Sequence, residues 1–249
     1  MDYNIAESAW VQIFAFLRSQ KGLHTKDEQK VRVFVEGVWY TLRTGCQWRL
    51  IPKIYGHWRA LHQRYTQWSH KGIWEALMGY VSEIDHQDVM LDSTITRAHA
   101  CASGYEKNGN TASALGRSKG GLSTKIHALV DALGNPIKFT LTPGQQHDIT
   151  QAEVLLKDIQ GANILADKAY YSIKLITMME SQSCTAVIPS KKNSKHPREI
   201  DLHIYKERHL IENFFSKIKH FRRVFSRFDK TIANYLGFIN FAGALIWMR

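Results

Sequence analysis

The chain has 249 residues, 44% of them hydrophobic, so it can bury one substantial core together with a smaller satellite. The 33 Lys and Arg residues outnumber the 22 Asp and Glu, and the formal net charge of +11 favours a polyanionic partner, above all nucleic acid. Three cysteines, odd in number and far apart, argue against a disulfide scaffold and against a zinc site.

The sequence also argues against a membrane-spanning or secreted protein. The longest largely apolar stretch, Tyr235 to Met248, contains Asn240 and is too short to cross a bilayer. The N-terminus carries Asp2 and Glu7 and lacks the basic flank and apolar core of a secretion signal. We therefore expect a cytoplasmic protein.

Apolar residues recur at helical spacing in the N-terminal third of the chain. The pattern predicts helices over 5–17 and 26–42, the second stopped by Gly45, and a further helix around Trp58. We expect an all-helical N-terminal domain over residues 1–84. The basic residues of this region fit a DNA-binding module, although tryptophan at helical spacing is more often part of a packed core.

Short apolar and β-branched runs predict an α/β domain over the remaining residues, 85–249. Strands are expected over 89–96, 125–133, 136–141, 164–166 and 185–188, with helices at 150–156 and from Ser172. The turn at Gly134 and Asn135 makes an antiparallel hairpin of the second and third strands. The expected core is a mixed five-stranded sheet with flanking helices.

Two further segments complete the predicted α/β domain. A stretch rich in Gly, Ser, Asn and Lys, at about 101–122, has almost nothing to bury and is expected to be a flexible loop. Two long helices, roughly His203 to Phe225 and Ile232 to Met248, are expected to close the chain.

Asp92 and Asp167 each end a short apolar run, which places a carboxylate at the end of a buried strand. Such burial is costly unless a cation compensates the charge, and a divalent metal ion would do so. The alternative is that each Asp caps the turn or helix that follows, a role that Ser93 and Ser172 could share.

A stripe of polar residues marks the first of the two closing helices. Tyr205, Arg208, Glu212 and Lys219 lie at offsets 0, 3, 7 and 14. At about 100° per residue they fall within an arc of roughly 60°, opposite the apolar residues Leu210, Ile211, Phe214, Ile218, Phe221 and Phe225. The alternative is a solvated face on which Arg208 and Glu212 form an ordinary ion pair of small energetic value.

These four residues match the Y-x2-R-x3-E-x6-K signature, and the chain resembles the DDE transposases of bacterial insertion sequences in the group numbered five. Further correspondence covers 91–94, 116–121, 125–127, 141–144, 147–148 and 166–168, together with Trp48, Arg49, Pro52 and Trp58 in the N-terminal region. The chain departs from the pattern at Tyr171 and Leu50, where an acidic residue is more usual. Neither departure touches the three acidic residues Asp92, Asp167 and Glu212.

The resemblance implies an RNase-H-like catalytic core in which Asp92, Asp167 and Glu212 hold Mg²⁺, with Mn²⁺ as a substitute. Such an enzyme cleaves DNA at the ends of its element and transfers the strand into target DNA. Tyr205 and Arg208 would then contact DNA. So would the basic residues Lys219, Arg222 and Arg223, which could instead form a solvated face.

The implied partner is double-stranded DNA, both the terminal repeats of the element and the target. Pairing two DNA ends favours a homodimer. A noncatalytic DNA-binding regulator, an RNase-H-like nuclease without strand transfer and an inactive copy remain alternatives. His99, His127 and His147 lack the close spacing of metal ligands and are interpreted as scattered polar or core residues.

Overall fold

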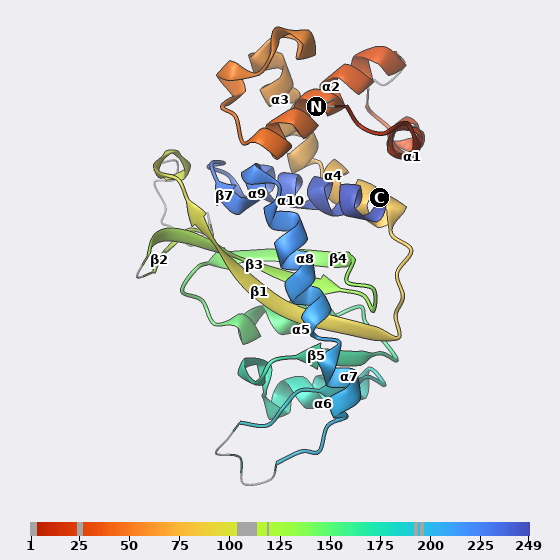
Figure 1. Cartoon of the computed structure of the whole chain (residues 1–249), viewed down its shortest axis with the longest axis vertical. Coiled ribbons are helices and arrows are strands. Elements are labelled where there is room, and N and C mark those ends of the chain that lie inside the picture. Colours follow the sequence, from red (N-terminus) through yellow and green to blue (C-terminus); the bar gives the residue numbers. More distant parts are fainter. Residues whose placement is uncertain (1–3, 24–26, 104–113, 119, 192–193, 195–196) are drawn as a thin grey trace. The chain divides into compact units, whose positions relative to one another are not determined.

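The computed structural model describes residues 4–23, 27–103, 114–118, 120–191, 194 and 197–249. The chain forms two compact units (Figure 1). The helical unit comprises Met1–Ser82, Arg97–Lys107 and Ile218–Arg249. The sheet unit comprises Glu83–Thr96 and Asn108–Lys217. The helical unit thus includes C-terminal residues that the sequence pattern assigned to the α/β domain.

Six α-helices are described in the helical unit: α1 (Glu7–Ser19), α2 (Glu28–Thr44), α3 (Trp58–His70), α4 (Ile73–Val81), α9 (Arg222–Phe225) and α10 (Ile232–Trp247). The Asp27 side chain caps α2 by accepting from the Lys30 N–H, and Gly45 ends the helix in the left-handed conformation at φ 68°. The predicted stop at Gly45 is therefore confirmed. A short strand, β7 (Ser226–Arg227), pairs with the end of β1.

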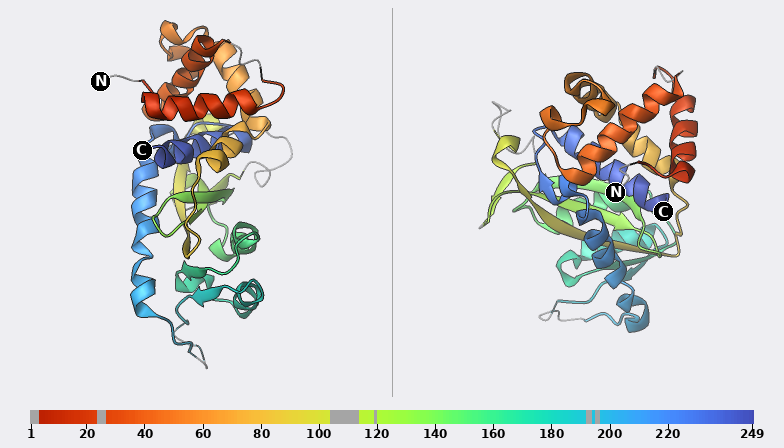
Figure 2. Two further views of the ribbon diagram at one scale, coloured as in Figure 1. Left: turned by 90° about the vertical axis from the view of Figure 1, so that its right-hand side faces the viewer. Right: turned by 45° about the horizontal axis from the view of Figure 1, so that its top comes forward.

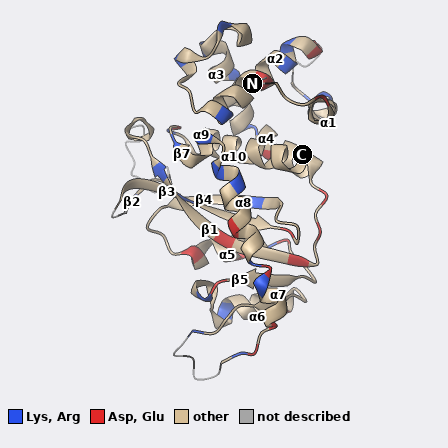
Figure 3. Cartoon of the chain, in the orientation of Figure 1, with Lys and Arg blue, Asp and Glu red and all other residues tan. Residues whose placement is uncertain are grey.

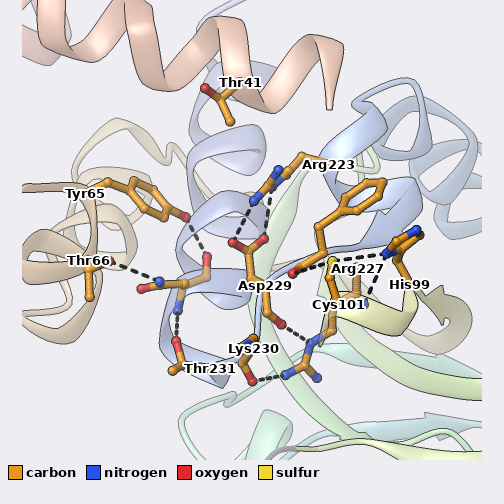
Figure 4. A network of polar contacts seen from close by, with 12 residues as sticks. Thr41, Tyr65, Thr66, His99, Cys101, Arg223, Arg227, Asp229, Lys230 and Thr231 are labelled. Atoms are coloured by element: carbon orange, nitrogen blue, oxygen red, sulfur yellow. Dashed lines mark hydrogen bonds and ion pairs between the residues drawn. The ribbon is translucent and has the colours of Figure 1, made fainter. Parts of the chain in front are cut away.

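Helix α10 forms the core of the helical unit and packs against α3 and α4. Its Phe238 stacks on Tyr65 with ring centroids 4.4 Å apart, and the Tyr65 hydroxyl donates to the Asn234 carbonyl at 2.5 Å (Figure 4). A Cβ at Gly237 would lie 2.6 Å from the Ser69 Oγ, so the close helix contact requires glycine. No helix among the described residues is long and apolar enough to cross a membrane.

The sheet unit is built on strands β1 (Asp88–Ala98), β2 (Gly116–Ser118), β3 (Gly121–Val130), β4 (Pro136–Pro143), β5 (Asn163–Ala166) and β6 (Thr185–Val187). The strand order is β2-β3-β1-β5-β6, with β4 paired to β3. The β3–β4 and β2–β3 pairs are antiparallel, whereas β5 is parallel to both β1 and β6. The predicted mixed sheet is present, with β2 and β7 as short additions.

Strand β2 lies inside the segment predicted to be a flexible loop. It forms because β3 begins at Gly121 rather than at Lys125, which gives Gly116 a partner in Ser123. Much of the rest of that predicted loop, residues 104–113 and 119, lies outside the described residues.

Helices cover both faces of the sheet. Helices α5 (Ala152–Leu156) and α6 (Ile173–Ser181) lie on one side, and α7 (Leu202–Lys206) and α8 (His209–Lys219) on the other (Figure 2, left). The core under α5 and α6 is apolar and includes Val89, Leu91, Leu155, Ile164 and Ile176. On the opposite face the Phe214 ring of α8 stacks on Phe139 of β4, with centroids 5.8 Å apart.

The prediction of one continuous helix from His203 to Phe225 is wrong, because the segment is divided into α7, α8 and α9. Between α7 and α8 the backbone bonds tighten to a three-residue spacing, as from the Leu210 N–H to the Glu207 carbonyl at 2.9 Å. The arc worked out for a continuous helix therefore does not describe the whole polar stripe. Phe225, expected on the packed face, is 59% exposed.

Candidate active site

The pairing of β1 with β5 brings two of the predicted acidic residues together. The last residue pair between the strands is Leu91 with Ala166, and Asp92 and Asp167 follow directly. Neighbouring strands lie about 4.8 Å apart, so the two aspartates are adjacent. β1 continues to Ala98 and so covers the strand predicted over 89–96, which places Asp92 inside its strand and not at the end of it. It is the partner strand β5 that ends there.

The Asp92 carboxylate is held on both oxygens. Its Oδ1 accepts from the Ser93 N–H at 2.7 Å, and its Oδ2 accepts from Arg208 Nη1 at 3.0 Å. Burial raises the pKa of Asp92 above its ordinary value, the Ser93 N–H and Arg208 act to lower it, and the charges of Asp167 and Asp148 raise it further. The raised pKa of Asp92 thus comes first from its burial, and the two neighbouring acids add to it.

Asp167 has the local role that the alternative interpretation gave it. Its Oδ1 accepts from the Ala169 N–H at 2.7 Å and caps the short 3₁₀ turn Lys168–Tyr170. Capping through one oxygen leaves the other lone pairs of the carboxylate for a further partner. The capping role and a ligand role are therefore compatible.

Arg208 links the third predicted acid to Asp92. It lies in the turn between α7 and α8, where its Nη2 donates to Glu212 Oε1 while its Nη1 donates to Asp92. Burial acts to lower the pKa of Arg208, but the charges of Asp92 and Glu212 outweigh it and raise the pKa. The acidic positions of β1 and α8 fall in the same region of the sheet unit (Figure 3).

A fourth acid, Asp148, belongs to this region, although no pattern in the sequence indicates a role for it. Its Oδ1 accepts from Ser93 Oγ at 2.9 Å and from Lys125 Nζ at 2.5 Å. Lys125 also donates to the Gln146 carbonyl at 2.7 Å. The network fixes the backbone that carries Asp92, because Ser93 is the next residue.

A buried tyrosine, Tyr170, lies near the three aspartates. Its hydroxyl is buried and has no hydrogen-bond partner within the described part of the chain. Burial raises the pKa of Tyr170, and the charges of Asp148, Asp92 and Asp167 raise it further. The phenol therefore remains neutral beside three carboxylates.

The predicted DNA-binding residues occupy different settings. Tyr205 lies on α7, and Lys219 ends α8, where burial lowers the pKa of its ammonium group. Arg222 is exposed at the start of α9. Arg223 is only 4% exposed and is bonded through two nitrogens to Asp229. It does not present its guanidinium at the surface, as a phosphate contact would require.

The donor set fits a hard divalent cation, because carboxylate oxygens are its preferred protein ligands. In this conformation no group of three or more His, Cys, Asp or Glu side chains among the described residues is placed to hold a metal ion. Arg208 instead supplies the positive charge between Asp92 and Glu212. A cation bound to all three acids would replace that charge.

Residues 83–247 match the protein family described as "Transposase DDE domain". The chain belongs to the DDE transposases. Residues 5–78 of this transposase match a second family, described as "Putative transposase of IS4/5 family". The DDE match and the mixed sheet with helices on both faces confirm the expected RNase-H-like class. Membership also implies a divalent metal cofactor.

Two curated relatives cover part of this transposase. The "Putative transposase for insertion sequence element IS6501" of Brucella ovis is 40% identical over 130 residues, which are 51% of this chain and 100% of that protein. The "Uncharacterized protein y4sN" of Sinorhizobium fredii is 30% identical over 108 residues, which are 41% of this chain and 83% of that protein.

Solved structures resemble the chain only distantly. The piggyBac transposase in a synaptic complex with hairpin DNA has a TM-score of 0.47 at 12% identity, and the alignment covers 96% of this chain and 64% of that one. The Mos1 transposase in a paired-end complex has a TM-score of 0.29 at 11% identity, with 80% and 81% covered. The chain thus spans less than two thirds of the piggyBac chain.

Proposed function

We propose that this transposase cleaves DNA at the ends of an insertion sequence and joins those ends to target DNA. Asp92, Asp167 and Glu212 are the metal ligands, with Mg²⁺ as the ion and Mn²⁺ as its substitute. The observation that carries the proposal is the β1–β5 register, which sets Asp92 beside Asp167, with Arg208 linking Asp92 to Glu212.

Divalent ions bound to the three carboxylates would activate the attacking water or 3′-hydroxyl and stabilise the leaving oxygen. Asp92 and Asp167 are fixed by their strands, whereas Glu212 is 58% exposed and reaches the site from a helix. Arg208 would be released from both acids if divalent ions bound to them. Its planar guanidinium then suits a DNA phosphate, which it can bind through two hydrogen bonds.

DNA contacts extend beyond the acids. Tyr205, Lys219 and Arg222 contact the DNA backbone, and the N-terminal domain over residues 1–84 binds the terminal repeats. Synapsis of two ends requires two active sites, so the protein acts as a homodimer on double-stranded DNA. It works in the cytoplasm, where the bacterial chromosome lies.

A joining assay tests the proposal. Purified protein is incubated with Mg²⁺, DNA that carries the terminal sequences and a supercoiled target plasmid. Glu212→Gln should abolish cleavage and joining while DNA binding persists. The matched control Glu153→Gln alters an exposed pair with Lys174 and should retain activity. Cleavage without joining would favour a nuclease, and binding alone in the wild type would favour a regulator or an inactive copy.

A further inference from the structure

The helical unit contains a pocket of about 550 Å³ that the proposed catalysis does not use. It is lined by Gly45, Gln47, Trp48, Arg49, Trp58, His62, His99, Cys101, Arg223, Phe228 and Lys230. The volume lies within the range of about 300–1,000 Å³ typical of small-molecule sites. The pocket therefore suits one nucleotide-sized group rather than a duplex.

The lining favours a flat, anionic ligand. Trp58 is half-buried, and the guanidinium groups of Arg49 and Arg59 lie over its ring at 5.4 and 5.3 Å. Lys230 is exposed at the same pocket. No acidic side chain is among the described lining residues. Aromatic faces bind nucleobases by stacking, while Arg and Lys attract phosphate.

Trp48 supplies an independent sign of a ligand. The residue is only 9% exposed, and its indole N–H has no hydrogen-bond partner in the described ranges. A buried donor without a partner is uncommon in native proteins and destabilises the fold. A ligand with an acceptor atom, such as a base carbonyl or ring nitrogen, would satisfy it.

Polar side chains line part of the pocket wall, among them Arg223 and His62. Arg223 is fixed by two bonds to Asp229 (Figure 4). It also donates to the Cys46 carbonyl at 3.0 Å. Burial lowers the pKa of His62, so its imidazole is neutral at pH 7 and offers both a donor and an acceptor. Of these two groups, the His62 imidazole is the one that can bond to the edge of a nucleobase, while Arg223 holds the pocket wall in place.

We propose that this pocket binds one unpaired nucleotide of a DNA strand, with the base against Trp58 and near the Trp48 N–H. The proposal rests on the proposed function only in taking DNA as the partner. A peptide or a lipid would bind to the apolar rings. Neither class of ligand needs the rings, the cationic side chains and the unpaired Trp48 N–H together.

Binding is tested in EDTA with the full chain, so that failure of the catalytic proposal cannot affect the result. The probes are a single-stranded oligonucleotide with a central 2-aminopurine and the same strand with an abasic site there. Wild type should quench the 2-aminopurine and bind this strand more tightly than the abasic one. Trp58→Ala should weaken binding by about 5- to 150-fold, the effect of losing one base–aromatic stack.

Two controls keep the test decisive. Trp58→Phe should recover most of the affinity, and Trp247→Ala, at a half-buried tryptophan that does not line this pocket, should change nothing. Without any substitution, the base-bearing strand should protect the exposed thiol of Cys101 from alkylation, read by mass spectrometry. Equal affinity for both strands, or an unprotected Cys101, would overturn the proposal.

Discussion

Removing the Arg208 side chain should destabilise the protein in a way that Mg²⁺ reverses. Arg208 and Asp92 are each 22% exposed and joined at 3.0 Å, and such a charge-assisted bond contributes about 1.5–3 kcal/mol. The ion pair between Arg208 and Glu212 adds little to the free energy of unfolding, because the Glu212 carboxylate is largely solvated. We therefore expect Arg208→Ala to lower the free energy of unfolding by about 1.5–3 kcal/mol at pH 7.

The pH dependence follows from the Asp92 carboxyl. Its pKa in the folded protein is already above the unfolded value, so the folded state binds more protons and loses stability as pH rises. Without Arg208 that pKa rises further. The difference in the free energy of unfolding between wild type and Arg208→Ala should therefore increase as the pH rises above about 4, and decrease as the pH is lowered toward 4.

Urea unfolding of both proteins, with and without Mg²⁺ and at several pH values, measures these effects. Mg²⁺ should raise the stability of Arg208→Ala more than that of wild type, because the cation supplies the missing charge. The control Arg198→Ala breaks an exposed pair with Glu180 and should cost less than about 1 kcal/mol. A variant that matches wild type at pH 7, or gains no more from Mg²⁺, would refute the reasoning.

Three other changes have expected outcomes. Asp148→Asn removes a charged acceptor of Lys125 and should slow DNA cleavage about 10- to 100-fold. Asp158→Asn, which changes the exposed pair with Lys138, should leave the rate unchanged. Single-turnover cleavage measures both rates. Gly237→Ala should lower the unfolding temperature through overpacking worth about 1–3 kcal/mol, while Gly79→Ala, with nothing within 4 Å, should not. Burial lowers the pKa of His127 from 6.5 to about 4. The free energy of unfolding should therefore fall by up to about 3 kcal/mol as the pH drops from 6.5 to 4. His127→Gln should abolish this loss.

The parts of the fold that the sequence predicted are those encoded by local patterns. Apolar runs ahead of Asp92 and Asp167 marked two strands, but the parallel pairing of β1 with β5 joins segments separated by three strands and α5, so no local pattern indicated it. The break near Arg208 escaped prediction, since neither Gly nor Pro interrupts the helical pattern there. At this break the backbone has the three-residue hydrogen-bond spacing, and Arg208 bonds to Asp92, which is distant in the sequence.

The functional groups that the sequence missed depend on contacts between distant segments. Asp148 meets Lys125 and Ser93 from positions 23 and 55 residues away, so no local spacing indicates the network. Arg223 was grouped with surface cations because a basic run does not reveal which member is buried. Its burial follows from the bonds to Asp229 and to the Cys46 carbonyl, and the latter is 177 residues away.

Iron-mediated backbone cleavage tests the central claim that one cation site is shared by three segments. Fe²⁺ replaces Mg²⁺ in the purified protein, and ascorbate with peroxide then generates radicals that cut the chain beside the bound ion. A shared site predicts cuts near Asp92, Asp167 and Glu212, all suppressed by excess Mg²⁺ and lost in Asp92→Asn. Cuts confined to other segments, or cuts that survive in Asp92→Asn, would contradict it.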